Sequence, residues 1–504
     1  MEKFRSLLVA VLALAAIAAG LWRLEADRRG VVVTQTTAGT TPVTVLAPEA
    51  GGSAPVVVIG HGFAGSRQLM LPFGLTLARN GYVAVLFDFP GHGRNPQPLL
   101  GGLANDAARN AALLESLDGV VRFARALPRS DGRLALLGHS MASDIVIRYA
   151  VEHPDIAATV AVSMFSPAVT ATEPRDLLVI AGALEPQMIR DEAARVVGLA
   201  AGGPPQPRVT YGDMAAGTAR RLSFSGGVEH IAVLYSRQSM VEALDWLNAA
   251  FGRSGSGWVD ARGPWLGLLY LGLVALAWPM SRLLPRLSAV PLGADLGWRQ
   301  FLPVALLPAL LTPLILWKLP TDFLPSLLGD YITVHFAVYG GLTAAGLALA
   351  GVRPVWPRPG MPLLFAVAAT AAYCILAIGL PIDRYLTSFL PTPQRAALML
   401  PMLAGTALYF TADEWLVRGR TPRRGRAALT KLCFLVSLAI AIALDPPRLF
   451  FLIIIVPVIL VFLIVYGLFA FWAWRRTGQP LVGAFANALA FAWAIAVTFP
   501  LVGG

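Results

Sequence analysis

A nucleophilic serine is predicted at Ser140, which lies in the pentapeptide GHSMA at 138–142. The apolar run 134–137 before it favours a strand, and the segment 142–151 after it favours a helix. A sharp turn from a strand into a helix lifts a serine hydroxyl out of the sheet, and such a turn needs small residues beside the serine. Ala142 stands where this turn usually has a glycine, and alanine still fits. The simpler alternative is that Ser140 only caps the helix.

Two further turns follow strand-like runs in the same region. The run 56–59 leads into GHGF at 60–63, and the run 83–87 leads into DFPGHG at 88–93. Together with the serine turn, these motifs resemble the α/β-hydrolase family, particularly its esterase, dienelactone-hydrolase-like and serine-aminopeptidase-like branches. The resemblance extends from about Val56 to Phe251, under half of the chain.

The resemblance implies a catalytic triad and an oxyanion hole. Glu185 ends the motif GALE after a strand-like run, where the family often has an aspartate, so it takes the place of the acid. His230 lies at a late strand end before a closing helix and takes the place of the base. The chain order Ser…Glu…His is the order that the fold requires. Phe63 and Met141 would donate backbone N–H groups to the oxyanion, and losing one such donor typically costs about 2.7–4 kcal/mol.

Other residues compete for these roles. Asp213 is the rival acid, and Glu185 could instead be a surface loop residue. Glu229 neighbours His230 but is expected to point to the opposite face of a strand. The other histidines of this region are expected to shape turns or to cap a helix. They are His61, His92, His139 and His153.

These residues predict serine-hydrolase chemistry that needs neither a metal nor an organic cofactor. His230 would take the proton of Ser140, whose oxygen attacks an acyl carbonyl, and water or another acceptor would release the acyl-enzyme. The leading hypothesis is an esterase, lipase or thioesterase with a small-molecule or lipid acyl substrate. A serine peptidase or an acyltransferase would use the same triad. A transporter or sensor with a hydrolase-like binding domain would not need all three groups.

Short runs rich in β-branched residues alternate with helical patterns, which predicts a mostly parallel sheet covered by helices on both faces. We expect this extracytoplasmic α/β-hydrolase domain at residues 30–255 and a Gly/Ser linker at 256–263. Residues 1–29 combine a basic start with an apolar stretch, which predicts a signal anchor or, alternatively, a cleaved signal peptide.

The composition is that of a membrane protein. Of the 504 residues, 56% are hydrophobic and 14% are charged, and the mean hydropathy is +0.64. Soluble domains average roughly 45–50% apolar and about 25% charged residues. We expect a transmembrane bundle of about eight helices at residues 264–504. The predicted spans start near Trp265, Phe301, Tyr331, Leu363, Ala396, Ala428, Leu449 and Leu481.

The net charge of +11 fits membrane orientation better than nucleic-acid binding. Basic residues gather in alternate loops, which would face the cytoplasm if the hydrolase domain lies outside. We therefore expect a multi-pass membrane protein of a bacterial inner membrane, with the hydrolase domain on the periplasmic side. Its partners would be the lipid bilayer and an acyl substrate and not nucleic acid, whereas the sequence gives no indication of the oligomeric state.

About ten residues separate the strand end near Met164 from Arg175, which leaves no room for the helical lid that many family members insert. We expect the outward-facing ends of the bundle to cover the site instead. The charged residues at these ends are Asp322, Asp330, Asp383, Arg384 and Arg395.

Two features of the bundle have polar side chains that are costly to bury in lipid. His335 lies inside a predicted span, where it would be either functional or simply hydrogen-bonded between helices. Asp413, Glu414 and Arg418 resemble the Glu-Glu-x-x-x-Arg motif of the CAAX-protease-like family. That family needs later histidines, and none follows His335, so a second active site is not expected.

Overall fold

The computed structural model describes residues 1–255, 257–356, 360–421 and 423–503. Residue 256 of the predicted linker and residues 357–359, 422 and 504 of the predicted bundle lie outside the described residues. The chain divides into two compact units. We call the first the α/β unit; it comprises Ala19–Gly267, Ile382–Ser388 and Pro500–Gly504. We call the second the helical unit; it comprises Met1–Ala18, Leu268–Pro381 and Phe389–Phe499.

The α/β unit is built on one mixed sheet. Its strands are β1 (Val31–Ala38), β2 (Thr41–Pro48), β3 (Ala54–Gly60), β4 (Val83–Phe87), β5 (Ser130–His139), β6 (Ile156–Val162), β7 (Leu177–Gly182), β8 (Thr210–Tyr211) and β9 (Arg220–Ser225). Their order across the sheet is β1-β2-β4-β3-β5-β6-β7-β9-β8. The strands from β4 to β9 in this order run parallel, and β1, β2 and β8 pair antiparallel at the edges.

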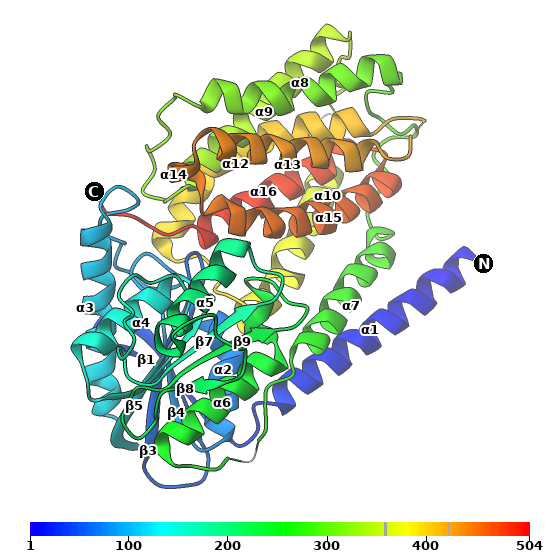
Figure 1. The fold of residues 1–504 in the computed structure, drawn as a ribbon. Coiled ribbons are helices and arrows are strands. Elements are labelled where there is room, and N and C mark those ends of the chain that lie inside the picture. Colours follow the sequence, from blue (N-terminus) through cyan, green and yellow to red (C-terminus); the bar gives the residue numbers. More distant parts are fainter. Residues whose placement is uncertain (256, 357–359, 422, 504) are drawn as a thin grey trace. The chain divides into compact units, whose positions relative to one another are not determined.

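Helices cover both faces of this sheet (Figure 1). Val57 and Ile59 pack toward α2 (Leu71–Arg79) and α6 (Arg237–Phe251). The alternate residues of β3 pack on the other face, toward α3 (Asp106–Arg125) and α4 (Met141–Glu152). α5 (Gln187–Ala201) covers the same face beyond α4. Because successive side chains of a strand point to opposite faces, both faces of the central strands need apolar residues.

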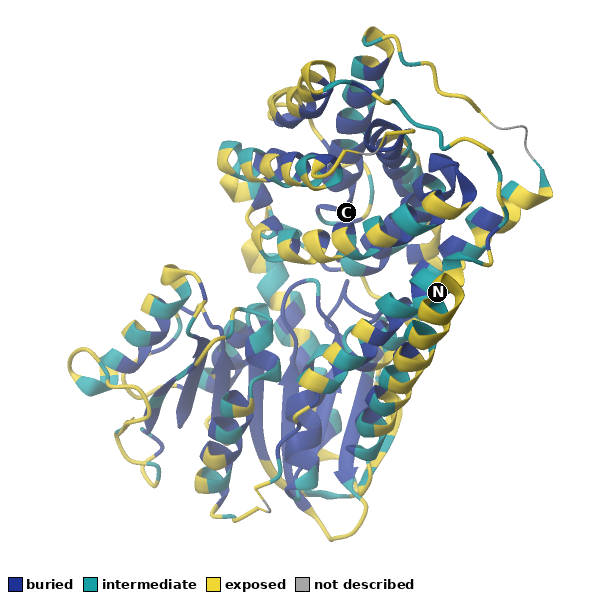
Figure 2. Cartoon of the chain, turned by 90° about the vertical axis from the view of Figure 1, so that its right-hand side faces the viewer, coloured by how far each residue is buried: buried dark blue, intermediate teal, exposed yellow. Residues whose placement is uncertain are grey.

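The central strands are accordingly buried, as the dark blue arrows of Figure 2 show. The β-branched runs that the sequence indicates lie within β3, β4, β5, β6 and β7. The predicted fold class, a mostly parallel α/β sheet joined to a helical C-terminal region, is confirmed. Parallel strands place their carboxyl ends at one edge of the sheet, and the loops after β3, β5, β6, β7 and β9 therefore meet there.

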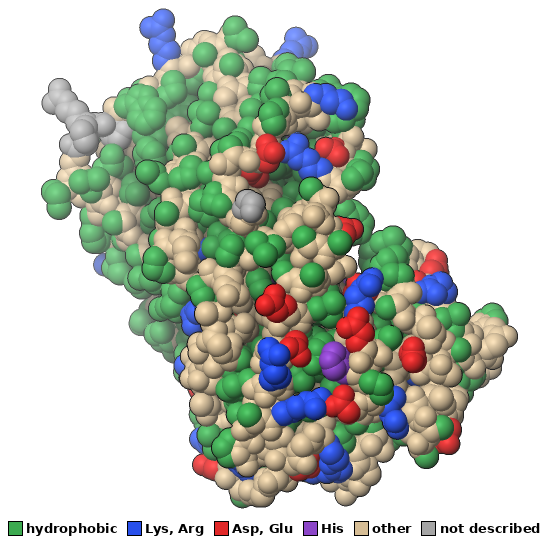
Figure 3. Space-filling view, turned by 90° about the vertical axis from the view of Figure 1, so that its left-hand side faces the viewer, with side chains coloured by type: hydrophobic (Ala, Val, Ile, Leu, Met, Phe, Trp, Pro, Cys, Tyr) green, Lys and Arg blue, Asp and Glu red, His purple; other side chains and the backbone are tan. Residues whose placement is uncertain are grey.

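The helical unit contains long apolar helices. After α6 the chain forms α7 (Gly263–Ser281), α8 (Trp298–Leu316), α9 (Gly329–Leu349), α10 (Met361–Ala372), α11 (Gly379–Tyr385), α12 (Pro393–Val417), α13 (Arg426–Leu444), the short α14 (Pro446–Leu449), α15 (Leu452–Thr477) and α16 (Pro480–Thr498). All of these belong to the helical unit except the start of α7 and the end of α11. Within the described residues, nine helices are long and apolar enough to cross a membrane, counting α1 (Glu2–Ala26) and Met361–Tyr385 as one span each. On the face that Figure 3 shows, hydrophobic side chains of this unit are widespread and charged side chains are few.

The two polar features that the sequence singles out in the bundle have local partners. His335 on α9 is buried, and its Nε2 lies 3.1 Å from the Ser437 hydroxyl on α13. Glu414 forms an ion pair with Arg418 one turn later at 2.7 Å. His335 is therefore hydrogen-bonded between two packed helices, which is the simpler of the two interpretations of this buried histidine.

Candidate active site

Ser140 lies in the turn between β5 and α4, in a strained backbone conformation. Its φ is +54° and its ψ is −118°, in a region that residues other than glycine seldom adopt. Steric contacts explain why the residues around Ser140 are small. A Cβ at Gly138 would lie 2.5 Å from the Ala142 carbonyl oxygen, and a Cβ at Gly60 would lie 3.0 Å from the Ala142 Cβ. A side chain larger than alanine at position 142 would therefore press on β3.

A hydrogen-bonded chain joins the serine, histidine and glutamate that the sequence singles out. The Ser140 hydroxyl lies 2.9 Å from His230 Nε2, and His230 Nδ1 lies 3.1 Å from Glu185 Oε2. A carboxylate only accepts hydrogen bonds, so it selects the imidazole form that carries its proton on Nδ1. Nε2 is then free to accept the proton of Ser140. The rival acid Asp213 instead accepts the Ala215 N–H within its own turn, at 3.0 Å.

The Glu185 carboxylate is buried and held on both oxygens. Oε1 accepts the Ser163 hydroxyl at 2.6 Å and the Gly182 N–H at 2.7 Å, while Oε2 faces His230. Glu185 follows β7, and Ser163 follows β6, so neighbouring strand ends bring them together. Sequence analysis missed Ser163; the one local signal is that it ends a strand-like run at the same edge as the nucleophile.

His230 lies in the turn after β9 and not on a strand. The sequence led us to expect Glu229 on the opposite face of a strand, but Glu229 lies in this turn as well. Its carboxylate accepts the N–H groups of Ile231 at 2.9 Å and Ala232 at 2.8 Å, and so orders the turn that carries the base. The prediction for Glu229 is wrong because it assumed that β9, which ends at Ser225, continues to this point.

His139 also contacts the base, which sequence analysis did not foresee. Its Nε2 lies 2.9 Å from the His230 carbonyl oxygen, which can only accept, so Nε2 carries the proton. The ring centroids of His139 and His230 are 5.0 Å apart. Burial, and next the nearby His230, lower the pKa of His139 well below its ordinary value. His139 is thus a neutral donor that holds the backbone of the catalytic-base candidate.

The loop after β3 lies directly against the serine. A Cβ at Gly62 would meet both the Ser140 Cβ and His139 Nδ1 at 2.9 Å, so this approach requires glycine. The Gly62 carbonyl accepts hydrogen bonds from His61 Nδ1 at 2.8 Å and from the Gly65 N–H at 3.1 Å. In a trans peptide the next N–H points opposite to this carbonyl, so these bonds also fix the direction of the Phe63 N–H.

His61 is buried and neutral. Its Nε2 accepts the Phe89 N–H at 3.1 Å, which leaves the proton on Nδ1 for the Gly62 carbonyl. Burial lowers the pKa of His61. The second predicted oxyanion donor, Met141, is the first residue of α4, and the first amides of a helix have no partner within the helix. Both predicted donors therefore lie on backbone next to Ser140.

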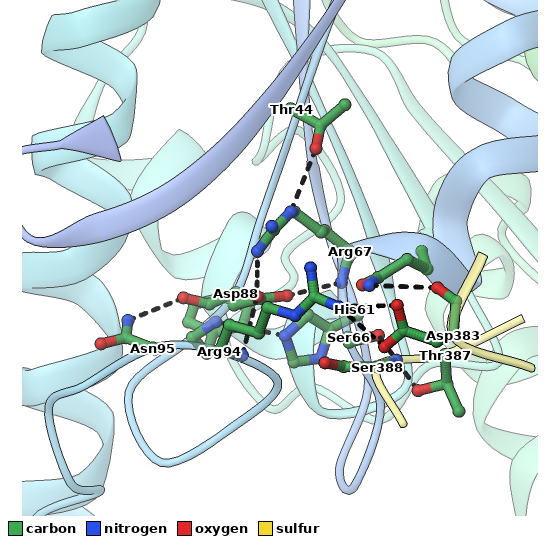
Figure 4. Close-up of polar contacts among 12 residues, drawn as sticks. Thr44, His61, Ser66, Arg67, Asp88, Arg94, Asn95, Asp383, Thr387 and Ser388 are labelled. Atoms are coloured by element: carbon green, nitrogen blue, oxygen red, sulfur yellow. Dashed lines mark hydrogen bonds and ion pairs between the residues drawn. The ribbon is translucent and has the colours of Figure 1, made fainter. Parts of the chain in front are cut away.

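A buried ion pair anchors the rest of this loop (Figure 4). Asp88, at the end of β4, pairs with the Arg67 guanidinium and accepts the Arg67 N–H at 2.7 Å and the Arg94 N–H at 3.0 Å. Arg67 Nε donates to the Thr44 hydroxyl at 3.0 Å. The motif at 88–93 thus supports the loop and contributes no side chain to the hydrogen-bonded chain described above.

Comparisons with known proteins agree with this architecture. Residues 52–195 match the family model described as serine aminopeptidase, S33. Uncharacterized proteins from two strains of Mycobacterium tuberculosis, CDC 1551 / Oshkosh and H37Rv, are 32% identical over 108 residues, which is 21% of this chain and 35% of each relative. The chain therefore spans about a third of the length of these curated relatives.

Two solved structures match part of the chain at low sequence identity. One is a predicted CIB-like hydrolase from Thermoplasma acidophilum, with 16% identity, a TM-score of 0.33, and coverage of 43% of this chain and 99% of that chain. The other is a hypothetical protein from Pseudomonas aeruginosa, with 13% identity, a TM-score of 0.34, and coverage of 45% and 95%. The strand order and the family match together identify the α/β unit as an α/β-hydrolase domain.

Proposed function

We propose that the protein is a serine hydrolase that cleaves an acyl ester or thioester through Ser140, His230 and Glu185. The observation that carries the proposal is the continuous hydrogen-bonded chain from the Glu185 carboxylate to the Ser140 hydroxyl. Each step of this chain has the donor and acceptor that the chemistry needs. The strained turn at Ser140 supports the proposal, because such strain is characteristic of functional residues.

The proposed mechanism follows from the geometry. His230 Nε2 takes the Ser140 proton as the serine oxygen attacks the acyl carbonyl, and the Glu185 carboxylate stabilises the imidazolium. The N–H groups of Phe63 and Met141 would donate to the developing oxyanion. His230 then protonates the leaving group, which gives an acyl-enzyme. Water, deprotonated by His230, attacks this ester and releases the acid and the free serine.

Exposed apolar side chains beside the site favour an apolar acyl group. Leu184, next to Glu185, is 66% exposed, and Phe165, just after β6, is 57% exposed. Met188, at the start of α5, is also exposed. Large apolar side chains gathered on one surface are uncommon unless they bind something. An acyl chain laid across them would reach Ser140 from the edge where the strand ends meet.

We further propose that the protein is a multi-pass membrane protein with the α/β unit on the extracytoplasmic side. The apolar helices support the membrane location, and the alternating distribution of basic residues supports the orientation. Alkaline phosphatase fused after residue 255 should be active in a bacterial host, whereas green fluorescent protein at this point should not fluoresce. The reverse pattern would overturn the orientation.

The function is tested by ester hydrolysis with the full-length protein in detergent. Nitrophenyl esters and thioesters of increasing chain length should be hydrolysed, with kcat/KM rising as the acyl chain lengthens. The Ser140→Ala variant should lose this activity and keep its melting temperature. A folded wild type that hydrolyses none of these substrates faster than Ser140→Ala would contradict the proposal.

A serine peptidase is the second candidate, because the matching family model is described as a serine aminopeptidase. The same groups would then act on an amide, and His230 would protonate the leaving amine. Aminoacyl nitroanilides distinguish the two candidates. Release of nitroaniline with a kcat/KM above that for every ester would favour the peptidase.

A further inference from the structure

A short segment from the C-terminal half of the chain belongs to the α/β unit. Ile382–Ser388 begins within the end of the candidate span Met361–Tyr385 and stops before the candidate span Pro393–Val417, yet it groups with the hydrolase domain. We call it the clamp segment. Of the charged residues expected to cover the site, Asp383 and Arg384 are in this segment. The others, Asp322, Asp330 and Arg395, belong to the helical unit.

The clamp segment contacts the loop that follows β3, residues 61–70, which we call the oxyanion loop. The Ser66 hydroxyl accepts the Ser388 N–H at 2.8 Å and lies 3.0 Å from the Thr387 hydroxyl. Gln68 Nε2 donates to the Asp383 carbonyl at 3.4 Å. Ser66 is fully buried and Ser388 is nearly so. These contacts are internal to the domain, and Figure 4 shows Asp383, Thr387 and Ser388 on the same side of Ser66.

An ion pair strengthens the same attachment. Arg94 Nη2 donates to both oxygens of the Asp383 carboxylate, at 2.8 and 2.6 Å. The Arg94 N–H donates to Asp88, which in turn holds Arg67 of the oxyanion loop. Asp383 therefore closes a connected set of charged groups around the loop. Such a network couples its members more strongly than separate surface pairs do.

The middle of the clamp segment has a second anchor. Arg384 donates to both oxygens of Glu25, at 2.7 and 2.8 Å, and the Tyr385 hydroxyl donates to Glu25 Oε1 at 2.5 Å. Glu25 lies in the last turn of α1, within the α/β unit. The segment is thus fixed on α1 at one place and on the oxyanion loop at another. Its position is set by the domain itself.

These contacts bear on the geometry of the oxyanion hole. Ser66 follows Phe63 by three residues, and the Gly65 N–H already holds the Gly62 carbonyl. A shift of Ser66 would move Gly65 and rotate the Gly62–Phe63 peptide. An oxyanion donor must sit at about 2.7–3.1 Å from the oxyanion to be effective. A small displacement at Ser66 would therefore reduce transition-state stabilisation more than substrate binding.

We propose that the clamp segment positions the oxyanion loop, with Asp383, Thr387 and Ser388 as positioning residues for the Phe63 N–H donor. The proposal rests on the serine-hydrolase function and deepens it. The catalytic power of the hydrolase domain then depends on residues at the end of one candidate membrane span and just after it in the sequence. The C-terminal half of the chain would then contribute to catalysis by the hydrolase domain, in addition to any role as a membrane anchor.

The experiment exchanges the two charges of the ion pair in the full-length protein. Arg94→Glu and Asp383→Arg are compared with the double variant and with Asp131→Asn, which breaks an exposed pair with Arg133 elsewhere on the unit. The readouts are kcat and KM for a nitrophenyl ester, and the Ki of an alkyl trifluoromethyl ketone. This ketone forms an oxyanion when the serine adds to it, whereas the bound ester does not carry one.

The proposal predicts that each single reversal lowers kcat by about 10- to 100-fold, changes KM by less than about twofold and raises Ki in proportion to the loss in kcat/KM. The double variant should recover most of the rate, and Asp131→Asn should match the wild type. The Thr387→Val and Ser66→Ala variants, which retain all charges, should also lower kcat.

Three outcomes would overturn this proposal while leaving the hydrolase function standing. Folded single variants with wild-type kcat and Ki would show that the clamp does not position the loop. A rise in KM with unchanged kcat would assign these residues to substrate binding. Rates that fall only with the melting temperature, without recovery in the double variant, would assign them to folding. A wild type that neither hydrolyses esters nor binds the ketone would overturn the hydrolase function, and this proposal with it.

Discussion

Replacement of Glu185 by glutamine tests the assignment of the acid more sharply than its removal would. The substitution keeps the shape of the side chain but makes one of its two terminal atoms a donor. At the Oε1 position an NH₂ group would face the Gly182 N–H, a backbone donor that cannot turn away. At the Oε2 position it would face only His230. The structure therefore predicts that the amide oxygen takes the Oε1 position and the NH₂ group points at the imidazole.

That orientation forces the wrong form of the base. His230 Nδ1 must then accept a hydrogen bond, so the proton moves to Nε2, which faces the Ser140 hydroxyl at 2.9 Å. An Nε2 that carries a proton cannot remove the serine proton. The corresponding substitution in a serine protease triad lowers kcat by about 10⁴-fold, equivalent to about 5.4 kcal/mol. We expect Glu185→Gln to lower kcat by about three to four orders of magnitude, with little change in KM.

The assay is ester hydrolysis by the full-length protein, with Asp213→Asn as the matched control. The control makes the same chemical change at the rival acid, whose side chain caps its own turn. It should retain wild-type activity. If Glu185→Gln stays within tenfold of the wild type while Asp213→Asn loses activity, the assignment of the acid is wrong and Asp213 takes its place.

Other predictions concern the surroundings of the site. Ser163→Ala removes a hydrogen bond to a buried carboxylate, so the free energy of unfolding should fall by about 1.5–3 kcal/mol and kcat by at least tenfold; an unchanged melting temperature and rate would show that this bond matters little. Gly62→Ala places a Cβ 2.9 Å from the Ser140 Cβ and from His139 Nδ1, so it should cost about 1–3 kcal/mol of stability and most of the activity, as measured by thermal melts and ester hydrolysis; full activity would mean that the loop can move away freely. Burial lowers the pKa of His61 and of His139, so unfolding takes up protons below their unfolded pKa of about 6.5, and stability should fall with decreasing pH by up to about 1.4 kcal/mol per pH unit for each histidine; a melting temperature that stays constant from about pH 7 to pH 5 would contradict this reasoning. A chain truncated after residue 267 lacks the clamp segment and also Leu501, which exchanges backbone hydrogen bonds with Leu99 and Gly91; it should lose most of its stability and esterase activity, and a truncated form as active as the full chain would show that these segments are dispensable.

The sequence predicts the centre of the sheet well because its signals are local. β4 is the continuous apolar run 83–87, and β5 ends in Gly138 and His139 before the serine turn. Each of these patterns lies within about ten residues. The position of β9 was not predicted correctly, because the sequence analysis places a strand end at His230 whereas β9 ends at Ser225. β9 begins with two arginines, Arg220 and Arg221, and its burial results from its place next to β7. Tertiary contacts, rather than a run of apolar residues, make it a strand.

In the candidate site, too, the residues with local sequence signals were predicted and those defined by tertiary contacts were not. Ser140, Glu185 and His230 each have a recognisable motif or place in the chain order, and the structure brings the three within hydrogen-bonding distance. The groups that hold them have no such signal. His139 contacts the backbone of a residue 91 positions away, and the clamp segment contacts Ser66 across more than 300 residues. Single hydrogen bonds at such separations leave no periodicity in the sequence.

The most direct test of the central claim is covalent labelling of the full-length protein in detergent with a fluorophosphonate, beside its Ser140→Ala variant. This reagent phosphonylates serines that a neighbouring base activates, with loss of fluoride, and digestion with mass spectrometry identifies the labelled residue. We predict a single labelled site at Ser140 in the wild type, no labelling of Ser140→Ala, and strongly slowed labelling of Glu185→Gln. A folded wild type in which Ser140 stays unlabelled, or in which labelling persists unchanged in Ser140→Ala, would contradict the account.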